Sequence, residues 1–120
     1  MNEELRRAER HALPPAIHVS DAMTGELIGR LVNISAGGSL LMARAPLLED
    51  TLYQLRFALP VESGSGHESL ELGAQVLWSE AGSTAGQYWA GLRFIGLGGE
   101  PARRLQAWLD RHRDAAGDVP

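Results

Sequence analysis

The stretch TLYQLRFAL, residues 51–59, carries apolar side chains at close to every second position. A strand directs successive side chains to opposite faces of a sheet, so this spacing predicts a strand with one buried face. The stretch is therefore expected to belong to a β-sheet, and the rest of the chain is expected to supply its neighbours. The apolar positions are Leu52, Leu55, Phe57 and Leu59.

Five further stretches have strand character, and turn-forming residues separate them. The polar segment PVESGSGHES, residues 60–69, is expected to be a long loop or a hairpin tip. About six short strands joined by turns predict an antiparallel sheet that closes into a barrel or folds into a sandwich. The other predicted strands are residues 16–20, 26–34, 39–43, 70–80 and 87–95.

The C-terminal part of the chain has a different period. The stretch GGEPARRLQAWLDRHRDAAG, residues 98–117, places apolar residues three and four apart, and Pro101 can occupy the first turn of a helix. One helix is expected to pack on the sheet, and residues 115–120 are expected to form a tail. The face that the helix buries is made of Leu105, Trp108, Leu109 and His112.

The composition is that of one soluble globular domain. The 120 residues suit a single core, with 44% hydrophobic and 22% charged residues. The absence of cysteine excludes disulfides and thiolate metal sites and fits a reducing cytosol. No apolar run reaches the roughly 20 residues of a membrane span, and the N-terminus lacks the apolar core of a signal peptide. We therefore expect a cytoplasmic protein without membrane insertion, whose domain comprises residues 16–114.

Positive charge is gathered at the N-terminus of an acidic chain. The formal net charge is -4, yet Arg6, Arg7 and Arg10 lie close together. The overall acidity argues against DNA or RNA as a partner, because long nucleic acids require an extended basic face. A small anion can still be held locally. Two prolines follow and argue against a long helix, so residues 1–15 are expected to form a flexible arm.

The stretch NISAGG, residues 33–38, lies between two predicted strands and allows two interpretations. Asn and Ser side chains readily bond nearby backbone groups, and Gly37 or Gly38 can take a positive φ, so the stretch can be a tight strand connection. Alternatively, Asn33 and Ser35 project from one face of a strand end beside a bare glycine backbone. Such a face can hold a planar polar ring.

Taken together, RRAER at residues 6–10 and NISAGG at residues 33–38 resemble the RxxxR and [D/N]xSxxG motifs of PilZ domains, the bacterial receptors for cyclic di-GMP. The stretch WAGLRF, residues 89–94, is similar to the family's late G-x-x-F strand, and the C-terminal helix matches in place and length. The resemblance therefore covers nearly the whole chain. The matched motif positions are Arg6, Arg10, Asn33, Ser35 and Gly38.

The resemblance implies an all-β fold with one C-terminal helix, built as a six-stranded antiparallel β-barrel whose N-terminal arm closes over the ligand. In this family the arm arginines engage phosphates and guanine, and the second motif surrounds a guanine base. A guanidinium group forks onto phosphate oxygens or a guanine edge and stacks on the base, which a lysine cannot do equally well. The expected ligand-binding residues are Arg6, Arg7, Arg10, Asn33, Ser35, Gly37 and Gly38.

Because 120 residues leave no room for a fused output domain, we also expect an output through an unidentified effector protein, which recognises the ordered arm and the nearby barrel surface. No other cofactor is expected. Some family members lack the arginine motif and serve only as protein-docking modules, so an adaptor that binds no nucleotide is the alternative. Asn33 stands where aspartate is commoner and cannot form a charge-assisted bond to guanine, which implies lower affinity. Leu5 stands where an arginine tends to accompany a stacked ligand dimer, which implies one ligand per chain.

Enzymatic activity is not expected. The four histidines are scattered, and the chain carries no catalytic, metal-binding or phosphate-binding fingerprint. An oligonucleotide-binding barrel would need a basic, aromatic strand face, whereas the predicted strands carry only Arg30, Arg56 and Arg93. The tryptophans lie in apolar periodic stretches and are expected in the core rather than as stacking platforms. They are Trp78, Trp89 and Trp108.

Overall fold

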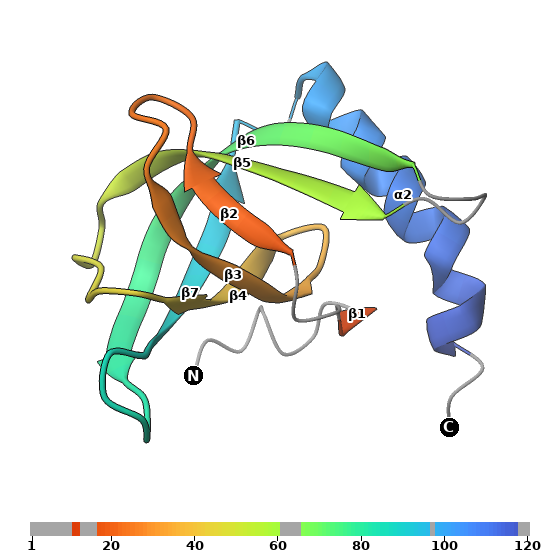
Figure 1. Cartoon of the computed structure of the whole chain (residues 1–120). Coiled ribbons are helices and arrows are strands. Elements are labelled where there is room, and N and C mark those ends of the chain that lie inside the picture. Colours follow the sequence, from red (N-terminus) through yellow and green to blue (C-terminus); the bar gives the residue numbers. More distant parts are fainter. Residues whose placement is uncertain (1–10, 13–16, 61–65, 97, 118–120) are drawn as a thin grey trace.

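The strands of the chain form a strongly curved sheet with one helix beside it (Figure 1). The structure is a computed structural model that describes residues 11–12, 17–60, 66–96 and 98–117. The helix, α2, comprises Glu100–Gly117. The strands are β1 (His11–Ala12), β2 (His18–Asp21), β3 (Leu27–Ile34), β4 (Gly38–Ala43), β5 (Leu52–Pro60), β6 (His67–Ala81) and β7 (Tyr88–Ile95).

Six of these strands close into a barrel. Their order is β3-β2-β5-β6-β7-β4, and β4 pairs back onto β3. Each of these pairs is antiparallel. β1 adds a short antiparallel pairing with β3, on the edge of β3 opposite to β4. Closure leaves each barrel strand with a partner on both sides. The predicted all-β fold, a six-stranded antiparallel barrel with one C-terminal helix, is confirmed.

The barrel core follows from the alternation in β5. Leu55, Phe57 and Leu59 are buried, whereas Arg56 between them is exposed. Leu52 is 63% exposed, because it lies an odd number of residues from Leu55 and therefore faces outward. Including Leu52 in the apolar face was wrong. The same alternation places the inward side chains of the other strands in one continuous core.

The hairpin between β5 and β6 is longer than predicted. β6 begins at His67 rather than at residue 70, and the ladder between the two strands extends to the pair Pro60 and His67. Residues 67–69, which the sequence placed in a polar loop, therefore belong to a strand. Proline is tolerated at this position because the end of a strand does not require its backbone N–H.

Helix α2 lies beside the β5–β6 hairpin (Figure 1). Leu105, Trp108 and Leu109 are buried in the barrel core cluster, which confirms the predicted apolar face for these residues. The Trp108 Nε1–H donates a hydrogen bond to the backbone O of Pro60 at 2.8 Å. The side chain of His112, the fourth predicted member of this face, lies outside the described part of the chain.

Two arginines of α2 attach the helix to β6 from the outside. Arg104 Nε and Arg111 NH2 each lie 3.1 Å from a carboxylate oxygen of Glu68. Surface ion pairs of this kind each contribute about 0–1 kcal/mol, so the buried apolar face supplies most of the docking energy. The helix continues to Gly117, beyond residue 114, where the sequence placed the end of the domain.

The three tryptophans do not share one environment. Trp108 is 2% exposed and belongs to the core. Trp78 and Trp89 are only partly buried, so the prediction that all three lie in the core was wrong for these two. The cause at Trp78 is a bulge in β6 between Val76 and Trp78. The extra residue turns Trp78 to the outer surface, where it lies opposite Gly91 of β7.

Among the described residues, no helix is both long enough and apolar enough to span a bilayer.

Candidate functional site

The stretch NISAGG joins β3 to β4, as expected for a strand connection. The backbone N–H of Ser35 donates to the O of Gly38 at 2.9 Å, which closes the turn. The N–H of Phe94 in β7 donates to the O of Gly37 at 2.8 Å. Because the loop is bonded both within itself and to a third strand, its backbone is held in one position on the barrel.

A bulge in β3 sets the direction of Asn33. Leu31 is fully buried inside the barrel, and simple alternation would direct Asn33 inward as well. The register shifts between these two residues, so that Leu31 pairs with Leu41 but Asn33 pairs with the partly exposed Leu40. Asn33 is therefore on the outer face while Ile34 is buried inside. A bulge that redirects one polar side chain is a common device at binding sites.

Ser35 is less accessible than the sequence suggested. Its exposure is 0%, and its Oγ lies 3.4 Å from the O of Gly38, to which it donates a long hydrogen bond. The expectation that Asn33 and Ser35 present one open polar face is therefore only half met. Asn33 is partly exposed, whereas Ser35 supports the turn from within.

The glycines of the loop do not have the special backbone that the sequence allowed. Neither Gly37 nor Gly38 has a positive φ, so that prediction was wrong. Among the described residues, no atom lies within 4 Å of a Cβ added at Gly37, so that part of the structure leaves open space beside this backbone. Gly38 begins β4 and is buried. At Gly37, the lack of a side chain leaves the backbone of the loop accessible as far as the described residues are concerned.

The strand partner of Gly38 is Arg93 of β7. The Arg93 side chain is exposed, and its Nε donates to Oε1 of Gln75 in β6 at 2.8 Å. In the sequence, Arg93 is only one of three arginines on predicted strands, and no local pattern connects it with the second motif. Alternation predicts its outward direction, but its position beside Gly38 depends on the pairing of strands distant in the sequence.

The N-terminal segment reaches the barrel beside the second motif. In β1, His11 pairs with Ile34 and Ala12 pairs with Asn33. Residues 11–12 therefore form a short strand within the segment that was expected to be a flexible arm. Arg6, Arg7 and Arg10 lie outside the described residues. Arg10 directly precedes His11, so the first motif ends immediately before the residues that pair with the second motif.

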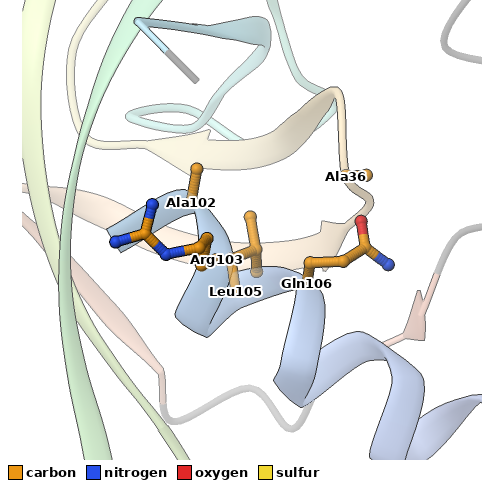
Figure 2. Close-up of a pocket in the computed structure, with 5 residues that line it drawn as sticks. All are labelled: Ala36, Ala102, Arg103, Leu105 and Gln106. Carbon is orange, nitrogen blue, oxygen red and sulfur yellow. The ribbon is translucent and has the colours of Figure 1, made fainter. Parts of the chain in front are cut away.

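A pocket of about 250 Å³ lies between the motif loop and the start of α2. Its lining includes Ala36 of the loop and Ala102, Arg103, Leu105 and Gln106 of the helix. Figure 2 shows Gln106 on the side of Ala36, with Arg103 extending the other way. Ligand pockets commonly measure roughly 300–1,000 Å³, so this one has room for a fragment of a nucleotide rather than for a whole dinucleotide.

A family model for the PilZ domain matches residues 4–111 of the chain. The chain belongs to the PilZ domain family. This match includes the RxxxR stretch, the NISAGG loop and most of α2.

Two solved PilZ structures have a similar fold. One is the PilZ domain with c-di-GMP of YcgR from Escherichia coli, with a TM-score of 0.60 and 16% identity, covering 95% of this chain and 98% of that one. The other is YcgR in complex with c-di-GMP from Escherichia coli, with a TM-score of 0.62 and 20% identity. That match covers 96% of this chain and 50% of the YcgR chain. A search of curated proteins found no match.

The second PilZ motif is thus assembled on one side of the barrel. Asn33 and Gly38 lie on neighbouring strands at the two ends of the loop, and Ser35 and Gly37 lie within it. β1 runs alongside at Ile34. Within the described parts of the chain, no group of three His, Cys, Asp or Glu side chains is placed to hold a metal ion.

Proposed function

We propose that this PilZ chain is a receptor for cyclic di-GMP, and that it acts as an adaptor rather than as an enzyme. The observation that carries the proposal is the pairing of His11 with Ile34. It supports a single site to which both motifs contribute, because His11 follows Arg10 and Ile34 lies between Asn33 and Ser35. A composite site of this kind is what a ligand with both bases and phosphates requires.

The two motifs have complementary chemistry for such a ligand. Arg6, Arg7 and Arg10 supply guanidinium groups that fork onto phosphate oxygens or onto guanine O6 and N7. Asn33 supplies an amide that both donates and accepts, and its partial exposure on the outer face supports contact with a guanine edge. The open space beside Gly37 supports close approach of a flat ring to the backbone.

In this proposal the output is a change in the N-terminal arm. A dianionic ligand bridges the arm arginines to the barrel and thereby offsets the conformational entropy lost when residues 1–10 become ordered. An effector protein in the cytoplasm then recognises the ordered arm together with the adjoining barrel surface. The affinity of this effector differs between the free and the bound receptor, which is what transmits the signal.

The second candidate is a PilZ adaptor that docks to proteins but binds no nucleotide. The buried Ser35 favours it, because its Oγ hydrogen bond to the O of Gly38 gives the serine of the motif a structural role. Under this alternative the NISAGG stretch is retained as a turn. The arm arginines would then contact the partner protein directly.

Thermal unfolding with and without nucleotide separates the two candidates. A ligand that binds only the folded state stabilises it by about 2.7 kcal/mol at a hundredfold excess over Kd. The receptor is therefore expected to melt several degrees higher with cyclic di-GMP and to be unaffected by GMP at the same concentration. An unchanged melting temperature with both nucleotides would favour the docking adaptor.

A further inference from the structure

Arg93 lies outside both PilZ motifs but next to the second one. Its strand partner across the β4–β7 ladder is Gly38. Leu92 and Phe94 are buried in the core, so Arg93 between them points outward. The Ser39 side chain is also fully buried, so alternation directs the neighbouring Gly38 to the outer face of β4, although Gly38 itself is buried. The arginine stem thus begins beside a residue that has no side chain to separate it from the motif loop.

The Arg93 side chain is held in place by a neutral partner. Gln75 is its strand partner on β6, and the Gln75 Oε1 accepts a hydrogen bond from Arg93 Nε at 2.8 Å. This bond uses Nε–H and leaves both terminal NH2 groups of the guanidinium for another acceptor. No carboxylate pairs with Arg93 among the residues described.

Three other arginines among the described residues are used differently. Arg56 forms an ion pair with Glu71 at 2.7 Å, and both Arg104 and Arg111 pair with Glu68. Their charges are compensated by neighbouring carboxylates. Within the described part of the chain, no carboxylate compensates the charge of Arg93 in this way, although the protein is acidic overall. An uncompensated and oriented guanidinium beside a binding loop is suited to a phosphate, whose oxygens match its two terminal nitrogens.

The backbone keeps Arg93 and the loop in a fixed relation. The N–H of Phe94, the next residue, donates to the O of Gly37 at 2.8 Å. Gly38 itself is paired with Arg93. Any ligand resting on the loop is consequently presented to the same guanidinium, without a rearrangement of β7.

We propose that Arg93 is a further ligand-binding residue, which contacts a phosphate of the bound cyclic dinucleotide from the β7 side of the NISAGG loop. The inference rests on the proposed function. It gives the ligand a cationic contact on the rigid barrel in addition to those on the arm. Gln75 acts as a positioning residue for this contact, since its amide oxygen holds Nε.

The test compares cyclic di-GMP affinities of the parent, Arg93→Ala and Arg93→Lys. Loss of a charge-assisted contact to phosphate is expected to weaken binding roughly ten- to a hundredfold in Arg93→Ala. Arg93→Lys keeps the charge but not the fork, so an intermediate affinity is expected. The affinity of Arg93→Ala should also fall less with added salt than that of the parent, because one screened contact is missing.

Arg56→Ala is the matched control, because Arg56 is also exposed on a barrel strand but pairs with Glu71. Its affinity for cyclic di-GMP should equal that of the parent. If the parent binds and Arg93→Ala binds within about twofold of it, the inference is wrong while the receptor function stands. If the parent does not bind cyclic di-GMP, the proposed function fails and the inference fails with it.

Discussion

His11, the residue that follows Arg10, is the antiparallel strand partner of Ile34, which lies between Asn33 and Ser35 of the second motif. The two motifs are far apart in the sequence, yet a backbone ladder pairs the two residues that follow the first motif with the start of the second. This pairing sets where the chain of the arm meets the barrel. It supports the proposal that the N-terminal arginines and the NISAGG loop contribute to one site.

Replacing Arg6 or Arg10 by Ala is expected to weaken cyclic di-GMP binding roughly ten- to a hundredfold, because each lost charge-assisted bond costs about 1.5–3 kcal/mol. The unfolding free energy should not change, since neither residue is expected to contribute to the barrel core. Calorimetric titration and denaturant unfolding provide the two measurements. If both single variants bind cyclic di-GMP with the affinity of the parent, the arm does not contribute to the binding site.

Three glycine substitutions should differ in their cost to stability. A Cβ at Gly29 would press on the backbone O of Met42 and come within 2.7 Å of Ala43 Cα, and backbone cannot move aside. A Cβ at Gly91 would meet the Trp78 indole, which has some freedom to shift. We expect losses of about 3 kcal/mol for Gly29→Ala and about 1–2 kcal/mol for Gly91→Ala.

Gly37→Ala is the matched comparison in this series. No atom of the described residues lies within 4 Å of the added methyl group, and φ is not positive, so the unfolding free energy should change by less than about 0.5 kcal/mol. Cyclic di-GMP affinity should nevertheless fall, because the methyl group occupies the space proposed for the ligand. Equal stability of all three variants in urea would contradict the packing described. Parent-like binding by Gly37→Ala would place the ligand elsewhere.

Much of the architecture could be predicted from local patterns. The alternation of Leu55, Phe57 and Leu59 identifies a strand, and the spacing of Leu105 and Trp108 identifies the helix, because the period of each pattern is set by local backbone geometry. β1 could not be found in this way. A pairing of two residues is too short to show a period, and it depends on a partner distant in the sequence.

In the candidate site, too, local patterns identify residues but do not predict features that depend on strand pairing. Asn33 was recognisable from its motif, but its direction depends on a bulge in β3 that shifts the register after Leu31. The position of Arg93 beside Gly38 depends on the register between β4 and β7. Such registers are set by the packing of the whole barrel, so the residues themselves do not reveal them.

Hydrogen exchange of residues 1–12 should slow when cyclic di-GMP is added. Ligand phosphates that bridge the arm to the barrel supply the free energy needed to protect these amides. Amides in the centre of β6, such as those of Ala74 and Val76, serve as an internal reference, because they belong to the buried barrel ladder in either state. Equal protection of the arm with and without ligand would refute the switch but leave simple binding intact.

Leu5 leads to a prediction about stoichiometry. Two stacked ligands would bring four phosphates, and a further guanidinium at this position would help to neutralise them. With leucine there, the parent is expected to bind one cyclic di-GMP per chain. Leu5→Arg should shift the endpoint towards two, as measured by titrating a known concentration of active protein. A parent endpoint near two would overturn the assignment.

The central claim is that this PilZ chain binds cyclic di-GMP at a site shared by both motifs. Isothermal calorimetry tests it most directly, with the parent and an Arg6→Ala/Arg10→Ala double variant titrated under identical conditions. The account predicts saturable heat for the parent and a loss of at least a hundredfold in affinity for the double variant. No saturable heat for the parent, or the same binding curve for both proteins, would contradict it.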